Sequence, residues 1–498
     1  MKKFGKVSAY ILIGLGFVLG FGIFILCRWS VQTFGVDIDT IIFTITSPLK
    51  GADSSVLWSA LTVCLPVILL VFALYFLYVY IDISYEDRWL ITISGRPVKG
   101  MLLVRSAVAV LSLGALLFGV LYANSQYDLL SYVAGRSGQT TIYEDHYVAP
   151  EDTNIRLKKG KNLIYVYVES LETTYTSHEN GGKQDRCYIP NLVELARENT
   201  TFSDSDKIGG FHNVTGTTYT MGALLSTTSG VPFAFPTGLN SMSRRQTFAS
   251  GLTTLGDILN DFGYRQEFLC GSDASFAGRR TYYTQHGNYE IFDWYTAQEK
   301  GYIPQGYKVF WGYEDMYLFE IAKDELIRLS QEEKPFNFTM LTVDTHHVHG
   351  YVCSLCEDTY DMQTKNVVSC TDRQVAEFIR WCQKQPFFED TAIIVTGDHP
   401  RMDTDMVEGV DTYDRTIYNC FINCETGAAE QLNLTNRTFT PMDIFPTTLA
   451  ALGFEWDGER LGLGTNLFSD QKTLAEELGF DYLNTELGKK SAYYPKFY

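Results

Sequence analysis

The hydrophobic and polar positions divide the chain into two parts with different patterns. The first part contains three long, almost entirely apolar runs, at about residues 9–27, 56–81 and 102–122. Each run is long enough to cross a hydrocarbon core as a helix, which takes about 20 residues. The first run is longer than the apolar core of a signal peptide and no Ala-x-Ala site follows it, so we expect an anchor. The pattern therefore predicts a membrane domain over residues 1–123 with three transmembrane helices.

The basic residues around these runs predict their orientation. Lys2, Lys3 and Lys6 precede the first run, and the loop 30–55 carries only Lys50. Four basic residues lie around the loop between the second and third runs: Arg88, Arg96, Lys99 and Arg105. Cytoplasmic loops are enriched in lysine and arginine. We therefore expect a multi-pass protein of the cell membrane, with its N-terminus in the cytoplasm and everything after Ala123 outside.

The second part of the chain alternates between two periodicities. Residues 124–161 are polar and irregular, which predicts a linker or a packed arm between the membrane and the outer domain. Short apolar, β-branched runs predict strands at 162–168, 265–270, 336–343, 392–395 and 416–423. Amphipathic stretches predict helices at 189–198, 217–228, 254–262, 315–332, 375–385 and 441–452. This alternation predicts an α/β fold over residues 162–498, with a doubly wound, mostly parallel sheet.

The net charge limits the class of binding partner, and the cysteine content bears on the cellular compartment. A net charge of −18 argues against a nucleic-acid partner, because neutralising phosphates requires a basic face. Eight of the ten cysteines lie after the apolar runs, where the predicted compartment permits disulfides. The spacing Cys353-x-x-Cys356 also fits a zinc site, but no second pair has matching spacing. We therefore expect disulfides rather than zinc, with a pairing that the sequence does not specify.

Two acidic segments follow predicted strands and indicate a metal site. Glu169 follows the run 162–168, and Asp398-His399 follows the run 392–395. The carboxyl ends of parallel strands form the ligand crevice of a doubly wound sheet. Two carboxylates and an imidazole there are suitable ligands for a divalent metal. Each segment alone also fits an ordinary strand-end acid or a turn.

Other polar segments contain candidate catalytic or substrate-binding residues, but their motifs are less specific. Thr217 and Thr218 lie after Gly216, at the start of a predicted helix, where free N–H groups can bind a phosphoryl group. A threonine there also fits a plain helix cap, and the two threonines are not separated by this argument. His346 lies in a segment with three histidines, which fits a metal ligand, a general acid or a polar loop. Arg279 offers a cation for a phosphate diester, or a solvated charge.

In this order, these segments resemble the phosphoglycerol transferases of the alkaline phosphatase/sulfatase superfamily. That group includes the lipoteichoic acid synthases and the membrane enzymes that add phosphoglycerol to osmoregulated periplasmic glucans, and the second are the more similar. The resemblance covers nearly the whole chain and rests on residues 34–51, 143–148, 162–175, 344–350, and 368–370 leading to 398–399. It implies a catalytic domain of alkaline phosphatase/sulfatase type.

The resemblance implies a specific role for each candidate residue. One divalent metal, with manganese expected and magnesium or zinc as alternatives, would be bound by Glu169, Thr217, Asp398 and His399. Thr217 would also be the nucleophile, chosen over Thr218 because the family pattern has a second hydroxyl three residues later, where Thr220 stands. His346 would lie near the substrate phosphate as an acid for the leaving group. The headgroup would be bound by Arg279 and Asp273.

The implied function is a membrane-bound transfer of glycerophosphate from phosphatidylglycerol to a glycan or polyglycerophosphate acceptor. A metal-activated threonine would be glycerophosphorylated first and an acceptor hydroxyl would then displace it. Alternatives are a phosphoethanolamine transferase, a hydrolase of the same superfamily, and a membrane-anchored binding protein. Ala277 stands where the lipoteichoic acid synthases have an aromatic residue, which favours the glucan-type branch. No Cys-x-Pro-x-Arg occurs to supply the formylglycine of a sulfatase.

Overall fold

The computed structural model describes residues 2–35, 38, 41–42, 54–85, 90–93, 96–234, 247–425 and 433–498. The chain divides into two compact units, which we describe separately. The helical unit comprises residues 1–36 and 53–134, and the sheet unit comprises residues 37–52 and 135–498. Lys50 and Arg88, which entered the predicted orientation, lie outside the described residues, as does most of the loop 34–51.

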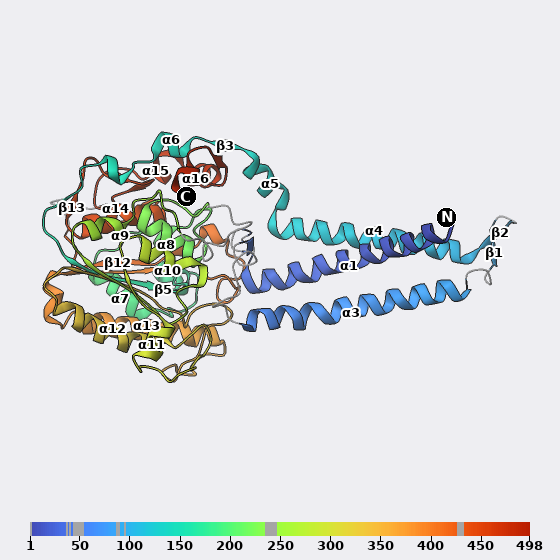
Figure 1. Ribbon diagram of the computed structural model, residues 1–498, viewed down its shortest axis with the longest axis horizontal. Helices are drawn as coiled ribbons and strands as arrows, with labels where there is room; N and C mark the ends of the chain where they lie inside the picture. The colour runs from blue at the N-terminus through green and yellow to red at the C-terminus, as the bar shows by residue number, and fades with distance from the viewer. Residues whose placement is uncertain are drawn as a thin grey trace. The chain divides into compact units, whose positions relative to one another are not determined.

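The helical unit consists of three long helices and a short hairpin (Figure 1). Its elements are α1 (Lys2–Phe34), α3 (Ser54–Tyr85), β1 (Leu90–Ile93), β2 (Arg96–Lys99) and α4 (Gly100–Tyr127). Each long helix contains a segment that is long and apolar enough to cross a membrane: Lys6–Phe34, Val56–Tyr85 and Gly100–Tyr127. The three helices predicted from the apolar runs are therefore present, and each extends beyond its predicted bounds.

Small residues allow α1 and α4 to pack closely. A Cβ on Gly20 would lie 2.4 Å from the backbone of Ala115, and a Cβ on Gly119 would lie 2.4 Å from the Gly20 carbonyl oxygen. The Ser112 hydroxyl donates a hydrogen bond of 2.7 Å to the Ile13 carbonyl. Small residues are common where helices associate in membranes, because contact between backbones then replaces contact with lipid.

One buried ion pair joins the three helices. The Arg105 Nε lies 2.9 Å from Asp82 Oδ1 and 2.8 Å from Asp82 Oδ2, and the Tyr10 hydroxyl donates to the same carboxylate. Asp82 is fully buried although the surrounding positions are apolar. A charge within an apolar helix bundle is costly unless it is paired. The three side chains therefore specify how α1, α3 and α4 are arranged.

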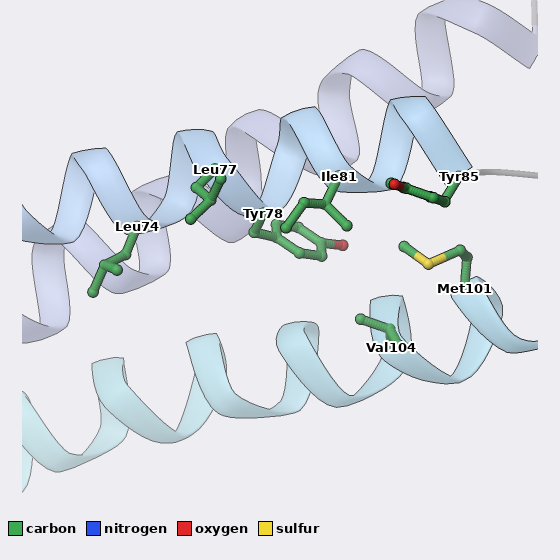
Figure 2. Close-up of a pocket in the computed structure, with 7 residues that line it drawn as sticks. All are labelled: Leu74, Leu77, Tyr78, Ile81, Tyr85, Met101 and Val104. Atoms are coloured by element: carbon green, nitrogen blue, oxygen red, sulfur yellow. The ribbon is translucent and has the colours of Figure 1, made fainter.

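An apolar groove of about 460 Å³ lies between α3 and α4. Figure 2 shows the side chains around it, which are Leu74, Leu77, Tyr78, Ile81, Tyr85, Met101 and Val104. Five of these seven side chains carry no hydroxyl or charge, and the other two are tyrosines, so the lining suits hydrocarbon. The groove belongs to the helical unit alone.

The sheet unit is built on a six-stranded sheet with the strand order β12-β10-β5-β9-β7-β8. Its strands are β5 (Asn162–Val168), β7 (Arg265–Cys270), β8 (Glu290–Phe292), β9 (Phe336–Leu341), β10 (Thr391–Gly397) and β12 (Asn419–Ile422). All neighbouring strands are parallel except β12, which runs antiparallel to β10. Along the chain, the strands on the β9 side of β5 (β7, β8 and β9) come before those on the β10 side (β10 and β12). The predicted doubly wound, mostly parallel sheet is confirmed.

Alternating side chains of β5 form two cores, one on each face of the sheet. Leu163, Tyr165 and Tyr167 pack on one face, and Ile164, Val166 and Val168 on the other. The first face is covered by α8 (Thr220–Ser229), α9 (Leu255–Asp261) and α14 (Pro441–Ala451), and the second by α7 (Pro190–Glu198), α12 (Asp315–Ser330) and α13 (Gln363–Cys382) (Figure 1). Residues that alternate along a strand point to opposite faces, so an entirely apolar strand is buried on both sides.

Three predicted elements differ from the observed ones. The helix predicted at 217–228 begins at Thr220 instead, because a turn occupies the residues before it. The helix predicted at 375–385 begins at Gln363, since its first half is polar in sequence yet packs on α7, whose first N–H groups bond to Asp372. The strand predicted at 416–423 is split into β11 (Thr416–Ile417) and β12.

The segment predicted as a linker is largely ordered as part of the sheet unit. It contains β3 (Gln139–Thr140), α6 (Ile142–His146) and β4 (Arg156–Leu157), and the two strands pair with β16 (Lys490–Ser491) and β13 (Phe454–Glu455). Tyr143 is buried against Tyr494, with ring centroids 5.3 Å apart. Apolar residues of this segment, such as Tyr143, pack on the distant C-terminal segment. Their spacing therefore shows no local periodicity.

The remaining elements are short. They are α5 (Leu129–Ser137), β6 (Phe211–His212), α10 (Arg279–Gln285), α11 (Trp294–Glu299), β14 (Arg460–Leu461), β15 (Gly464–Thr465), α15 (Leu474–Leu478) and α16 (Phe480–Leu487), with several 3₁₀ turns between them.

Candidate metal centre and active site

Three adjacent strands deliver the candidate residues to one edge of the sheet. Glu169 directly follows β5, Asp398 and His399 follow β10, and the segment 344–350 begins shortly after β9. Because β10, β5 and β9 are parallel neighbours, their carboxyl ends lie side by side. The order of the chain reverses at β5, which makes this edge the expected crevice of the sheet.

Glu169, Asp398 and His399 form one buried cluster. Their ligand atoms all lie within 4.8 Å of one another. The His399 Nε2 is 3.4 Å from Glu169 Oε1 and 3.4 Å from Asp398 Oδ2. All three side chains are almost completely buried. The structure thus brings together three of the four predicted metal ligands, from positions 230 residues apart in the chain.

The hydrogen bonds around this cluster leave its ligand atoms directed inward. The His399 Nδ1–H donates to the Pro400 carbonyl at 2.8 Å, so in the neutral ring Nε2 carries the lone pair. Asp398 Oδ1 accepts from the backbone N–H groups of Ser170 and His399, both at 2.8 Å. Its Oδ2 is buried with no hydrogen-bond partner among the described residues. A buried anionic oxygen needs a partner, and the donor set suits a divalent metal.

The charges of the cluster are strongly coupled. Burial, and then the Glu169 carboxylate, raise the pKa of Asp398 to about 7. Burial opposes the charged form of His399, but Asp398 and Glu169 outweigh it and raise the pKa of the imidazole to about 9. For Glu169, burial is outweighed by the His346 and His399 imidazoles, which hold its pKa below the ordinary value. The cluster therefore attracts positive charge, as a metal site must.

Thr220 supplies the hydroxyl of this cluster. Its Oγ1 lies 3.2 Å from His399 Nε2 and 3.4 Å from Glu169 Oε2. Thr220 is the first residue of α8, and no side chain caps this end of the helix. The first N–H groups of a helix have no partner within it and favour anions. A hydroxyl, a candidate metal site and an anion-binding helix end therefore meet at Thr220.

The structure does not bring Thr217 to the cluster. Its Oγ1 donates to the Val214 carbonyl at 2.8 Å and accepts from the Val214 N–H at 2.9 Å. Thr217 is completely buried, and it closes the turn in which Gly216 has a φ of +83°. Thr218, the alternative, is also buried. Because this turn delays the start of α8 by three residues relative to the prediction, the threonine at the helix start is Thr220.

His346 lies beside the cluster, close enough for its charge to act on Glu169. Its Nδ1–H donates to the His347 carbonyl at 2.7 Å, which leaves Nε2 for another partner. Its ring packs against Trp311, with centroids 4.5 Å apart. Burial is the main cause that lowers the pKa of His346. In its neutral form the ring therefore presents an acceptor at Nε2.

Asp273 and Arg279 follow β7 and lie at the same edge of the sheet. Arg279 is buried, and its Nη2 bonds to Ser272 Oγ and to the Asp273 carbonyl, both at 3.0 Å. The Asp273 Oδ1 accepts from the Ser275 N–H at 2.8 Å. The Arg279 guanidinium lies 5.8 Å from the centre of the Phe276 ring. The backbone of the 273–279 turn thus holds both predicted headgroup residues.

Trp311 connects these residues to His346 and was not anticipated. Its ring lies 5.3 Å from Phe276 and 4.5 Å from His346, measured between centroids. Its Nε1–H is buried without a hydrogen-bond partner among the described residues. A single tryptophan in a loop carries no pattern that marks a site, so only its place beside His346 could identify it.

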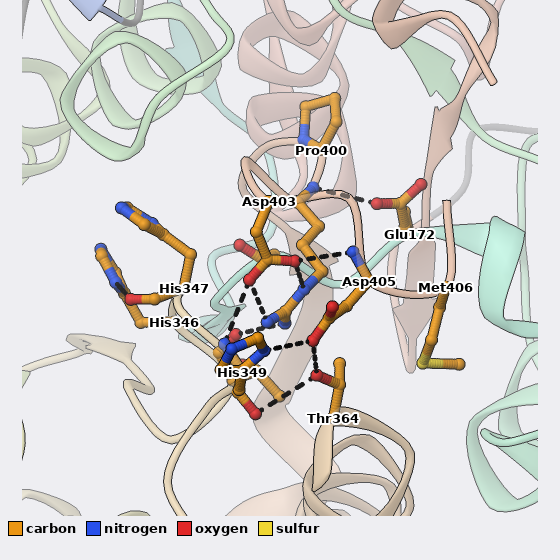
Figure 3. A network of polar contacts seen from close by, with 12 residues as sticks. Glu172, His346, His347, His349, Thr364, Pro400, Asp403, Asp405 and Met406 are labelled. Atoms are coloured by element: carbon orange, nitrogen blue, oxygen red, sulfur yellow. Dashed lines mark hydrogen bonds and ion pairs between the residues drawn. The ribbon is translucent and has the colours of Figure 1, made fainter. Parts of the chain in front are cut away.

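A second polar network holds the loop of His346 in place (Figure 3). Arg401 Nε and Nη2 bond to the two oxygens of Asp403, both at 2.5 Å, and Nη1 donates to the Thr345 carbonyl at 3.0 Å. The His349 N–H donates to Asp403 Oδ2 at 3.1 Å, and its Nδ1 lies 2.7 Å from Asp405 Oδ2. The turn after β10 is thereby tied to the loop after β9.

Comparisons with known proteins give the family of the chain. A family model described as sulfatase matches residues 161–454, which is more than half of the chain. Phosphoglycerol transferase I of Xanthomonas axonopodis pv. citri is 31% identical over 257 residues, covering 50% of this chain and 35% of that protein. Phosphoglycerol transferase I of Escherichia coli is 31% identical over 317 residues, covering 62% of this chain and 39% of that protein. The chain thus matches well under half the length of these curated relatives.

Several solved structures are similar to the chain. A protein of the alkaline phosphatase superfamily from Vibrio parahaemolyticus has a TM-score of 0.49 and 24% identity, covering 65% of this chain and 74% of that chain. The lipoteichoic acid synthase LtaP from Listeria monocytogenes has a TM-score of 0.46 and 20% identity, covering 63% and 79%. On the extent of the family match, the chain belongs to the sulfatase family.

Proposed function

We propose that this protein is a membrane-bound phosphoglycerol transferase that moves glycerophosphate from phosphatidylglycerol to a hydroxyl of a surface or periplasmic glycan. The observation that carries the proposal is the place of the Thr220 hydroxyl, against Glu169 and His399 at an uncapped helix start. The relatives named phosphoglycerol transferase I support this choice of donor. The three apolar helices would anchor the sheet unit, outside the cytoplasm, near the lipid donor.

The proposed metal site consists of Glu169, Asp398, His399 and Thr220. The orphaned Asp398 Oδ2 and the inward His399 Nε2 supply the donor atoms, and manganese is the expected ion, with magnesium or zinc as alternatives. When bound there, a divalent ion would lower the pKa of a hydroxyl and neutralise charge on phosphoryl oxygens. The fourth ligand assigned from the resemblance, Thr217, is replaced in this proposal by Thr220.

In the first step, Thr220 Oγ1 attacks the phosphorus of the lipid. The Oγ1–P bond forms while the bond from phosphorus to the diacylglycerol oxygen breaks. Oγ1 reacts as the alkoxide, its proton having gone to solvent, and it leaves phosphorus as the alkoxide again in the second step. The first N–H groups of α8 are oriented to stabilise the phosphoryl oxygens. The product is a glycerophospho-threonine and free diacylglycerol. A covalent intermediate of this kind holds the group until an acceptor arrives.

His346 is the proposed proton donor and acceptor of the two steps. Since its Nδ1–H is bonded to the His347 carbonyl, Nε2 is the atom that faces a substrate. As imidazolium it gives a proton to the departing diacylglycerol oxygen. As the neutral base that remains, it takes the proton of the acceptor hydroxyl, whose oxygen then displaces Thr220 from phosphorus. One imidazole thus returns to its starting state after both steps.

Arg279 and Asp273 are the proposed headgroup residues. The Arg279 guanidinium is held by Ser272 and Asp273 backbone and side-chain oxygens, so it presents a fixed positive charge to the phosphate diester. The Asp273 carboxylate can accept hydrogen bonds from glycerol hydroxyls. A phosphoethanolamine headgroup would bring an ammonium to the same carboxylate, so donor identity is a direct outcome of the experiment below.

The test is the intact mass of the full-length protein after incubation with phosphatidylglycerol and manganese, followed by peptide mapping. A glycerophosphate adduct on Thr220, absent in Thr220→Ala and present in Thr217→Ala, is the expected result. Diacylglycerol release without an adduct and without an acceptor would indicate a hydrolase. An adduct only with phosphatidylethanolamine would indicate the other transferase, and an adduct on Thr217 would overturn the assignment of the nucleophile.

A further inference from the structure

A second group of ligand side chains lies outside the site described above. Cys353 and Cys356 follow the His346 loop, and Cys370 lies on α13. The Cys353 Sγ is 3.6 Å from the Cys356 Sγ and 3.9 Å from the Cys370 Sγ, and all three sulfurs lie within 4.8 Å of one another. Cys353 and Cys370 are buried, and Cys356 is half-buried.

These distances have the size expected for sulfurs around one metal ion. Zinc binds thiolates at about 2.3 Å, so two thiolates of a tetrahedral site lie about 3.8 Å apart. A disulfide brings two sulfurs to about 2.05 Å and leaves any third thiol without a partner. Three mutually close thiols on two separate segments therefore fit a shared ion better than any one pair.

An amide N–H donor lies beside two of the three sulfurs. The Gln374 Nε2 donates towards the Cys370 Sγ at 3.4 Å and the Cys353 Sγ at 3.9 Å. N–H donors stabilise the anionic sulfur, which is the form that binds metal.

We propose that Cys353, Cys356 and Cys370 form a thiolate site for a soft divalent metal, with zinc as the expected ion. An oxygen ligand, either water or Asp344, would complete a tetrahedral site. Asp344 Oδ2 is buried without a hydrogen-bond partner among the described residues. The half-buried Cys356 gives water a route to the same position.

This site would have a structural effect on the catalytic loop. Cys353 follows Tyr351, whose N–H donates to the Asp344 carbonyl at 2.7 Å and so closes the loop that carries His346. An ion shared between Cys353, Cys356 and Cys370 would join the end of that loop to α13. It would supplement the Arg401 network, which holds the other side of the loop.

The proposed site would reverse the preference drawn from the sequence, which favoured disulfides over zinc. Cys353-x-x-Cys356 has no second pair at a matching spacing, and that observation counted against a metal. The structure supplies a single third thiol, Cys370, from the first half of α13, a half that the sequence pattern did not predict to be helical. A third ligand from a helix needs no recurring spacing in the sequence.

The experiment is thiol alkylation of the purified full-length protein in detergent, read by peptide mass spectrometry. Alkylation is carried out as purified, after chelation, and after reduction. For a metal site, Cys353, Cys356 and Cys370 resist alkylation until the chelator is added. Alkylation only after reduction, with a cross-linked peptide beforehand, would show a disulfide. Immediate alkylation of Cys356, the accessible thiol, would show free thiols. Either of these two results would overturn the proposal.

Cobalt substitution separates this ion from one at the catalytic cluster. Thiolate ligands give bound cobalt a charge-transfer absorption in the near ultraviolet, whereas Glu169, Asp398 and His399 contain no sulfur. We expect this absorption in the wild type and in Glu169→Gln, and its loss in Cys370→Ser. Cys382→Ala, a matched change on the same helix outside the cluster, retains it. An absorption that is absent in the wild type would refute the site even if phosphoglycerol transfer is confirmed.

Discussion

Two buried polar clusters at the same edge of the sheet differ in their charge balance. In the Arg401–Asp403 cluster, the guanidinium bonds to both carboxylate oxygens at 2.5 Å, and each remaining group has a backbone partner. In the Glu169–Asp398–His399 cluster, two carboxylates share one imidazole and Asp398 Oδ2 accepts no hydrogen bond from the described residues. The hydrogen bonds of the first cluster pair its charges, whereas the second leaves a buried carboxylate oxygen without a hydrogen bond, which suits a cation.

The difference shows how one turn performs two tasks. Asp398, His399, Arg401 and Asp403 lie within six residues of the chain. The first two belong to the cluster with Glu169, whereas the last two bond to the Thr345–His349 loop. Figure 3 shows Asp403 beside His349. A fully satisfied ion pair resists movement, so it can hold an unsatisfied site in a constant geometry. Breaking each cluster separately should therefore have different consequences.

The largest effect is expected from Thr220→Ala. Loss of the proposed nucleophile should reduce transfer by more than about 10⁴-fold, as for nucleophiles of other covalent enzymes. Thr217→Ala should leave the transfer rate within a few-fold, because that hydroxyl bonds only to the Val214 backbone, and should cost about 1–2 kcal/mol of stability. Initial transfer rates and denaturant unfolding measure both. Equal loss of transfer in the two variants would contradict the comparison.

Arg401→Met should have the second-largest effect, and it should act on stability. Removing one partner of a buried ion pair leaves Asp403 as an uncompensated charge, which costs about 3–5 kcal/mol. The double variant Arg401→Met/Asp403→Leu should recover part of that loss. Lys158→Met, which breaks the exposed pair with Glu455, is the control and should change stability by less than about 1 kcal/mol. Denaturant unfolding monitored by tryptophan fluorescence provides the measurement.

Glu169→Gln should weaken metal binding more than it weakens the fold. Replacing a ligand carboxylate by an amide removes a charge that the ion requires, so manganese affinity should fall by at least about 100-fold. Glu172→Gln is the matched control, because Glu172 is also buried but is bonded to Arg401 and Arg415 instead. Isothermal titration with manganese compares them. If Glu172→Gln loses the metal and Glu169→Gln keeps it, the two clusters have been assigned in reverse.

The smallest effect is expected from His349→Ala. The side chain is 58% exposed, and its contact with Asp405 lies at the edge of the Arg401 network. Exposed pairs contribute about 0–1 kcal/mol, and the transfer rate should remain within a few-fold of the wild type. His346→Ala, three residues earlier, should reduce transfer by about 10²-fold or more as a lost proton donor. A large loss in His349→Ala would extend the active site to this dyad.

Strand positions were readable from the sequence because they depend on local patterns. The observed β5 and β7 have the predicted bounds, since continuous apolar runs of this length are buried on both faces of a parallel sheet. Strand direction then puts Glu169 and Asp398-His399 at one edge without further information. The three apolar helices followed equally directly from the length and composition of their runs.

The identity of the hydroxyl in the site was decided by tertiary structure. Thr217 and Thr220 have the same chemistry and lie in one short segment, and only the turn that closes on Val214 determines which of them begins α8. The contact of Thr220 with Glu169 and His399 spans 51 and 179 residues of the chain. No local periodicity carries such information.

The sequence by itself therefore determined the two-part organisation, the doubly wound sheet and the strand-end ligands. Only the tertiary structure decided that Thr220 completes the cluster, that Trp311 adjoins His346, and that Cys370 joins Cys353 and Cys356. The physical reason is the range of the interactions. Burial and strand direction act on neighbouring residues and leave a periodic trace, whereas a site is assembled from single side chains that distant segments bring within a few ångströms.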